Sequence, residues 1–147
     1  MSERLRIPDD VEHAEVVGFV EMTADALWPL WTTAGGLERW WWPMFDDTRY
    51  EIDAREGGSY RIQTGEGGFG VRGRYLELEE GERIAQSWVW LSGDASAGRE
   101  ELVTVDFAEV AGGVRIVVRQ TAPIDEVDDF REGWQDCLTR LEELADE

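Results

Sequence analysis

The sequence contains no lysine and no asparagine, a single histidine (His13) and a single cysteine (Cys137). One cysteine excludes an internal disulfide framework. Without lysine, 14 arginines stand against 33 aspartates and glutamates, and the formal net charge is −19. An anionic surface of this kind repels the phosphates of nucleic acids and of anionic lipids. We therefore expect no nucleic-acid partner and no membrane partner.

Long hydrophobic runs are also missing. The most apolar stretches, residues 15–22 and 87–91, are far too short to span a bilayer. The N-terminal MSERLRIPDD lacks the apolar segment of a signal peptide, so we expect a cytoplasmic protein. The 147 residues, 42% of them hydrophobic, predict a single domain over 1–147 with one sizeable core.

The acidic excess allows more than one interpretation. It favours solubility in any setting. It is also compatible with a salt-rich cytosol, where ions screen the repulsion between like charges. The exclusive use of arginine as the basic residue is compatible with genome composition alone. The sequence leaves these interpretations open.

Apolar residues alternate with polar ones in seven segments, which is typical of half-buried strands. Glycine-rich and acidic turns such as REGG, EEGE and EVAGG separate most of them, which predicts an antiparallel meander. The predicted strands cover residues 13–21, 49–54, 58–64, 69–79, 82–90, 101–110 and 113–122.

Helical patterns occupy the remaining parts of the chain. Residues 22–43 predict two short helices, with Thr23 and Thr33 as N-caps and Pro43 as the stop. Residues 125–146 predict a long amphipathic helix with Asp125 as N-cap, in which Gly133 allows a close approach to the sheet. Its apolar stripe consists of Phe130, Trp134, Cys137, Leu138, Leu141, Leu144 and Ala145.

The order of these elements predicts an α+β fold. One long helix with one apolar stripe packs on one antiparallel sheet only if the sheet curls around it. We therefore expect a helix-grip arrangement, in which about seven strands wrap around the C-terminal helix and the two short helices close one end. A curled sheet of this kind leaves a space between itself and the helix.

The pattern resembles the START-like (SRPBCC) superfamily, and within it the branch named for activators of the heat-shock-protein-90 ATPase. The resemblance covers nearly the whole chain. It is carried by ADALWPLWTTAGGLERWWWP, GGSYRIQ, GRYLELEEGERIAQSW, VTVDFAEVAGGVRIVVRQ and EGWQDCLTRLEEL. Two positions depart from the family pattern: Trp42 stands where relatives often have glycine, and Gln120 where histidine is common.

The resemblance implies the fold but leaves the function open, because the superfamily carries many functions. The first interpretation is a module that holds a small apolar molecule between sheet and helix. The second is a protein-interaction domain that acts like the ATPase activators, although these carry an additional N-terminal domain and only about a dozen residues precede the first strand here. The third is an enzyme of the polyketide cyclase or dehydratase type.

Three consecutive tryptophans in RWWWPMF cannot share one face of a regular element. If a helix ends here, Trp40 and Trp41 lie on the side of Leu37 and belong to the core. Trp42 then faces either the rim of a pocket or solvent, and Phe45 extends the apolar patch.

The candidate ligand-binding residues follow from strand parity and from the helix stripe. Gln86 and Gln120 share the inner face with apolar neighbours, where a buried amide needs a partner such as a second amide, Tyr60, water or a ligand. We predict a cavity lined by Tyr60, Gln86, Trp88, Gln120 and Trp134, with Trp42 or Phe45 near its mouth.

Catalytic and metal-binding patterns are weak. His13 has no companion ligands at suitable spacing, and Cys137 lies on the buried helix stripe. GEGGFG at 65–70 matches a dinucleotide fingerprint formally, but a strand follows it where a helix is required. We therefore expect no metal, no cofactor and no identifiable catalytic residue, and we interpret GEGGFG as a turn and a bulge.

Overall fold

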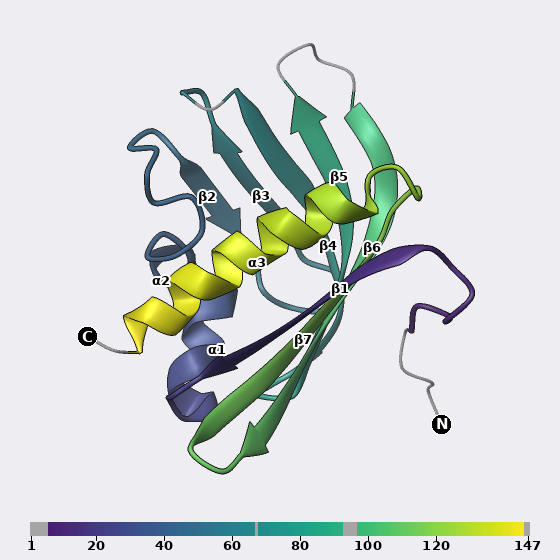
Figure 1. The fold of residues 1–147 in the computed structure, drawn as a ribbon. Coiled ribbons are helices and arrows are strands. Elements are labelled where there is room, and N and C mark those ends of the chain that lie inside the picture. Colours follow the sequence, from purple (N-terminus) through teal and green to yellow (C-terminus); the bar gives the residue numbers. More distant parts are fainter. Residues whose placement is uncertain (1–5, 67, 93–96, 146–147) are drawn as a thin grey trace.

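The computed structural model describes residues 6–66, 68–92 and 97–145, and within these ranges it forms one seven-stranded antiparallel sheet and three helices (Figure 1). The chain begins with β1 (His13–Val20), α1 (Ala24–Thr32) and α2 (Ala34–Leu37). It continues with β2 (Arg49–Ile52), β3 (Ser59–Thr64), β4 (Phe69–Glu79), β5 (Arg83–Ser92), β6 (Ala97–Val110), β7 (Gly113–Thr121) and α3 (Val127–Leu144).

The sheet has the order β1-β7-β6-β5-β4-β3-β2, so each strand from β2 to β7 pairs with its neighbour in sequence. β1 closes the far edge by pairing antiparallel with β7, and Val16 lies opposite Val118. The sheet curves around α3, which crosses its concave face, while α1 and α2 lie at one end (Figure 1). The predicted α+β helix-grip fold is confirmed.

The short helices begin where their caps predict. The Thr23 hydroxyl accepts a hydrogen bond from the Ala26 N–H at 3.1 Å, and the Thr33 hydroxyl accepts one from the Gly36 N–H at 2.9 Å. The second helix is shorter than predicted because α2 ends at Leu37 and the chain continues through turns. The predicted core positions of Trp40 and Trp41 are nevertheless confirmed, since both side chains are buried.

The long helix has the predicted stripe but a different start. Trp134, Cys137 and Leu141 are buried, as the periodicity indicates. The predicted N-cap at Asp125 is wrong: the cap position is Glu126, which makes no side-chain capping bond. Its carboxylate instead accepts a hydrogen bond of 2.8 Å from Arg99, so a tertiary ion pair replaces the local cap.

The close approach between α3 and the sheet depends on Gly18 of β1, and not on Gly133 as predicted. A Cβ at Gly18 would lie 3.2 Å from Leu138 Cδ1 and 3.1 Å from Glu142 Oε2, whereas a Cβ at Gly133 meets nothing within 4 Å. Glu142 Oε2 also accepts a 3.2 Å hydrogen bond from the Phe19 N–H. The C-terminal half of α3 is therefore held tightly against β1, and the side of Gly133 is open.

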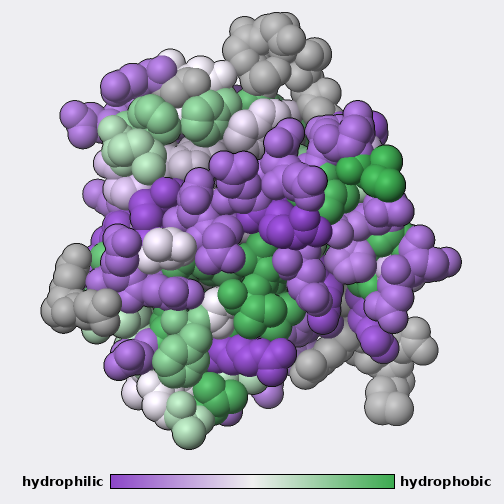
Figure 2. All heavy atoms as spheres, in the orientation of Figure 1, coloured by the Kyte–Doolittle hydropathy of each residue, from purple (hydrophilic) through white to green (hydrophobic). Residues whose placement is uncertain are grey.

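Hydrophilic side chains cover most of the face that includes α3, and a small group of hydrophobic residues lies near its centre (Figure 2). No helix in the described ranges is long and apolar enough to cross a membrane. The turn between β3 and β4 contains Gly68 at φ 74°, a backbone conformation that favours glycine. This confirms the predicted turn, whereas the register shift of β4 lies between Tyr75 and Glu77, where it pairs with β5, and not at GEGGFG as predicted.

Candidate functional site: an aromatic pocket between the sheet and α3

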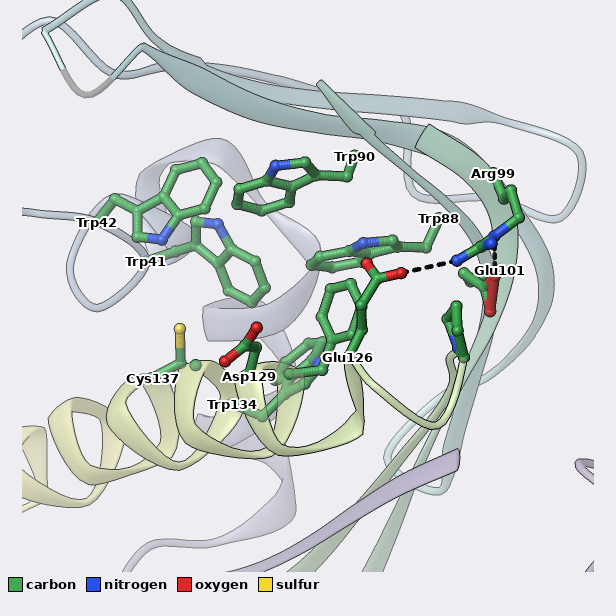
Figure 3. Close-up of a pocket in the computed structure, with 13 residues that line it drawn as sticks. Trp41, Trp42, Trp88, Trp90, Arg99, Glu101, Glu126, Asp129, Trp134 and Cys137 are labelled. Atoms are coloured by element: carbon green, nitrogen blue, oxygen red, sulfur yellow. Dashed lines mark hydrogen bonds and ion pairs between the residues drawn. The ribbon is translucent and has the colours of Figure 1, made fainter. Parts of the chain in front are cut away.

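A pocket of about 600 Å³ lies between β5, the start of β6, the segment after α2 and the N-terminal half of α3. Side chains from the sheet and from the turn after α2 lie on one side of this space, and those of α3 on the other (Figure 3). The lining residues are Trp41, Trp42, Trp88, Trp90, Arg99, Glu101, Pro123, Glu126, Asp129, Phe130, Gly133, Trp134 and Cys137. This volume falls in the range of small-molecule sites, which are typically apolar clefts with a few polar groups.

The walls belong to a continuous network of aromatic rings that includes all eight tryptophans of the chain. Trp41 is central: its ring centroid lies 5.1 Å from that of Trp134 and 6.0 Å from that of Trp88. Trp88 stacks on Trp90 at 6.4 Å. Edge-to-face and offset aromatic pairs contribute stability beyond their buried area, so the network forms a stiff wall.

The three consecutive tryptophans have different surroundings, but each ring contacts the next: the centroids of Trp40 and Trp41 lie 5.5 Å apart and those of Trp41 and Trp42 5.8 Å apart. Trp40 is fully buried, and its indole N–H donates to the Leu30 carbonyl at 2.7 Å. Trp41 also lies in the core but lines the pocket. Trp42 has φ 55° and packs edge-to-face on Phe69 at 4.5 Å. Left-handed backbone is unfavourable for a bulky residue, and this turn places the third ring beside Trp41 in the pocket wall.

Among the described residues, Trp42 is the one non-glycine residue with a positive φ. Glycine adopts this conformation without strain. The ring contacts of Trp42 with Phe69 and Trp90 offset the strain that tryptophan brings.

Two strand residues and one helix residue complete the aromatic wall. Trp88 and Trp90 lie two positions apart on β5 and therefore point to the same face of the sheet. Trp134 on α3 faces them, and its centroid lies 5.6 Å from that of Trp88. Its indole N–H donates to Gln120 Oε1 at 2.7 Å, which fixes the orientation of the ring.

The indole N–H groups of Trp41 and Trp88 are buried, and neither has an acceptor among the residues that the structure describes. An unpartnered buried donor is costly, at about 1–3 kcal/mol. Both side chains line the pocket. Both nitrogen atoms are closed to solvent, so they are polar groups of the core and not contacts that the pocket offers.

One end of the pocket is charged. Arg99 on β6 bonds to Glu126 at 2.8 Å and lies 3.7 Å from a carboxylate oxygen of Glu101 (Figure 3). The other oxygen of Glu101 accepts a 2.6 Å hydrogen bond from Thr121. Asp129, the third carboxylate of the pocket, forms no ion pair with a described residue.

Three of the predicted ligand-binding residues lie on the pocket wall: Trp42, Trp88 and Trp134. Gln120 is fully buried behind Trp134. The other three do not line the pocket. Phe45 packs against Phe69 at 5.7 Å, further out along the patch that begins at Trp42.

Tyr60 and Gln86 form a separate polar contact beneath β3 and β5. The Tyr60 hydroxyl donates to the Ser87 carbonyl at 2.6 Å. Burial raises the pKa of Tyr60 well above its usual value, and a hydrogen bond with Gln86 opposes that shift. We predicted that the Gln86 amide needs a hydrogen-bond partner, and Tyr60 is that partner.

Sequence reasoning missed several lining residues. Trp90 has the same strand parity as Trp88, and Phe130 lies on the apolar stripe of the helix. The sequence therefore indicated that both side chains point inward, but not that they line the pocket. No local sequence pattern indicated the charged lining residues, because the tertiary structure brings Arg99 and Glu126 together.

The pocket contains one thiol, and it is inert. Burial raises the pKa of Cys137 to about 12, although the nearby Arg140 guanidinium opposes this shift. A thiol that stays protonated at physiological pH is a poor nucleophile. Among the described residues, no group of three or more His, Cys, Asp or Glu side chains is arranged to hold a metal ion.

The sequence model of the family described as "Activator of Hsp90 ATPase homolog 1-like protein" matches residues 21–146. No curated protein matches the chain.

Among solved structures, DynU16 of the dynemicin biosynthetic locus has a TM-score of 0.77 and 22% identity over 92% of this chain, which spans 47% of the DynU16 chain, about half of its length. CV1439 from Chromobacterium violaceum has a TM-score of 0.76 and 22% identity, with 92% of this chain and 99% of that chain covered. CalU16 from Micromonospora echinospora has a TM-score of 0.66 and 19% identity, with 88% and 71% covered. At these identities the likeness establishes the fold alone.

Proposed function

The chain belongs to the activator of Hsp90 ATPase homolog 1-like family, and from that premise we propose that it binds a small, mostly apolar molecule in the pocket between the sheet and α3. The observation that carries this proposal is the aromatic recess of about 600 Å³ walled by Trp41, Trp42, Trp88, Trp90 and Trp134. Aromatic faces on opposite walls suit a flat or aliphatic ligand.

A recess favours a small ligand over a protein partner. Trp41, Trp88 and Trp134 are each only 4% exposed, which leaves the half-buried Trp42 and Trp90 as the more accessible indoles of the recess, out of reach of a flat protein surface. The energetic centres of protein interfaces depend on such aromatic anchors being accessible to the partner. The protein-interaction alternative therefore requires a different surface of the molecule.

Chemistry of the cyclase or dehydratase kind needs an acid–base group directed at a substrate. Arg99 engages both Glu101 and Glu126, the Cys137 thiol stays protonated, and Asp129 is then a single carboxylate with no second acid–base group beside it among the lining residues. The lining therefore supports binding more directly than catalysis.

Titration with the neutral probe N-phenyl-1-naphthylamine tests the proposal, because its fluorescence rises in apolar surroundings. We expect saturable 1:1 binding with a Kd in the micromolar range, which corresponds to about −8 kcal/mol. Gly133→Phe should abolish binding, because its ring would enter the pocket from a position with open space around it.

Gln135→Phe is the matched control, since this exposed residue of α3 does not line the pocket and the same ring there should leave the Kd unchanged. The proposal fails if the wild-type protein gives no saturable signal. It also fails if both phenylalanine variants bind as the wild-type protein does.

A further inference from the structure

The lining of the pocket combines aromatic faces with an excess of negative charge. Three carboxylates and one guanidinium line it: Glu101, Glu126 and Asp129 against Arg99. The lining thus carries two more negative than positive charges. Because Arg99 engages Glu101 and Glu126, its positive charge is already shared between two carboxylates.

Asp129 is the lining carboxylate that Arg99 does not engage. It projects from α3 into the space below Trp41, on the side opposite the strand tryptophans (Figure 3). Its neighbour Asp128 pairs with Arg131 at 2.5 Å, but Asp129 forms no ion pair with a described residue. A positive group in this space would have a carboxylate on one side and indole faces on the other.

Indole faces attract cations through their quadrupole when the cation lies within about 6 Å of the ring centroid, and tryptophan is the strongest of the aromatic residues in this respect. Of the lining rings, Trp42, Trp90 and Phe130 are half-buried and offer accessible faces, whereas Trp41, Trp88 and Trp134 are nearly closed by their neighbours. A carboxylate ligand such as a fatty acid would find here no basic side chain that is not already paired, among the described lining residues.

We infer that the ligand is an organic cation: a flat or aliphatic apolar body that bears an amine or quaternary ammonium group, held between the indole faces and the Asp129 carboxylate. This inference rests on the proposed function, and it adds the charge of the ligand. It also agrees with the acidic composition, since long-range attraction by a net charge of −19 raises the local concentration of cations.

Three probes with the same apolar body test the inference by calorimetric titration: (2-naphthylmethyl)trimethylammonium, 2-naphthalenemethanol and 2-naphthylacetate. We expect the ammonium compound to bind at least about tenfold more tightly than the alcohol, and the acetate to bind most weakly. The preference should persist in part at 1 M KCl, where the screening length is about 3 Å and only contact interactions survive.

Asp129→Asn should weaken binding of the ammonium probe several-fold and leave binding of the alcohol unchanged. Asp136→Asn is the control, because it removes the same charge from an exposed position on α3 that does not line the pocket. Equal losses in the two variants would overturn the inference, since they would show a general effect of surface charge.

The remaining outcomes separate this inference from the proposed function. Binding of the alcohol with no advantage for the ammonium probe overturns the inference and supports the pocket as a site for apolar ligands. Tightest binding by the acetate also overturns it. Absence of saturable binding by all three probes overturns both proposals.

Discussion

The indole N–H of Trp134 on α3 donates a hydrogen bond of 2.7 Å to Oε1 of Gln120 on β7. Both side chains are buried, at 4% and 0% exposure, so the bond joins helix and sheet inside the core. The amide nitrogen of Gln120 has no partner among the described residues. The glutamine therefore acts as an acceptor that orients one wall of the pocket.

Gln120→Leu should destabilise the protein by about 1 kcal/mol. The change leaves the Trp134 N–H without an acceptor, which costs about 1–3 kcal/mol, while loss of the unpartnered amide nitrogen offsets part of that. Urea denaturation of Gln120→Leu, Trp134→Phe and the double variant measures the coupling. An interaction energy near zero in this cycle would contradict a stabilising bond between the two side chains.

A matched pair of glycine substitutions tests where α3 touches the sheet. Gly18→Ala should destabilise by about 1 kcal/mol, because the new Cβ would lie 3.2 Å from Leu138 and 3.1 Å from Glu142. Gly133→Ala should instead stabilise by about 0.5–1 kcal/mol, because alanine favours a helix interior and nothing lies within 4 Å. Thermal and urea unfolding of both variants should give opposite signs; the same sign for both would show that the helix is placed differently.

Trp42→Gly and Trp42→Ala separate backbone strain from ring packing. Both variants lose the contacts with Phe69 and Trp90. Only glycine adopts φ 55° without strain, so Trp42→Gly should be more stable than Trp42→Ala by about 1 kcal/mol. Equal unfolding free energies would indicate that the turn relaxes once the ring is removed.

Alkaline pH should weaken the fold. Burial raises the pKa of Cys137 from 9.0 to about 12, so between these values the unfolded chain loses a proton that the native protein keeps. The free energy of unfolding is therefore undiminished below about pH 9 and falls as pH rises toward 12. Burial raises the pKa values of Tyr50, Tyr60 and Tyr75 too, which adds to the loss above about pH 10.

Urea denaturation at pH 8, 9.5 and 11 checks this prediction, with Cys137→Ala as the control. The variant should lose little stability between pH 8 and 9.5, where the thiol of the unfolded chain is the group that titrates. A wild-type stability that stays constant up to pH 11 would contradict the raised pKa values.

The periodicity of apolar residues and the helix-capping residues predicted much of the fold from the sequence. The two-residue alternation of Ile84, Gln86 and Trp88 gave the inner face of β5, and the spacing of Trp134, Cys137 and Leu141 gave the buried side of α3. These features depend on residues only a few positions apart, so local geometry decides them. The caps at Thr23 and Thr33 are local for the same reason.

The sequence by itself determined that three adjacent tryptophans cannot share one face of a regular element, that Trp88 and Trp134 point inward, and that the surface is strongly anionic. Only the tertiary structure decided that Gln120 bonds to Trp134, that Gly18 sets the approach of α3, and that Arg99 displaces a local cap at Glu126. Each of these contacts joins residues from different elements. Their distance depends on how the sheet curls around the helix, and no local pattern of residue types encodes that packing.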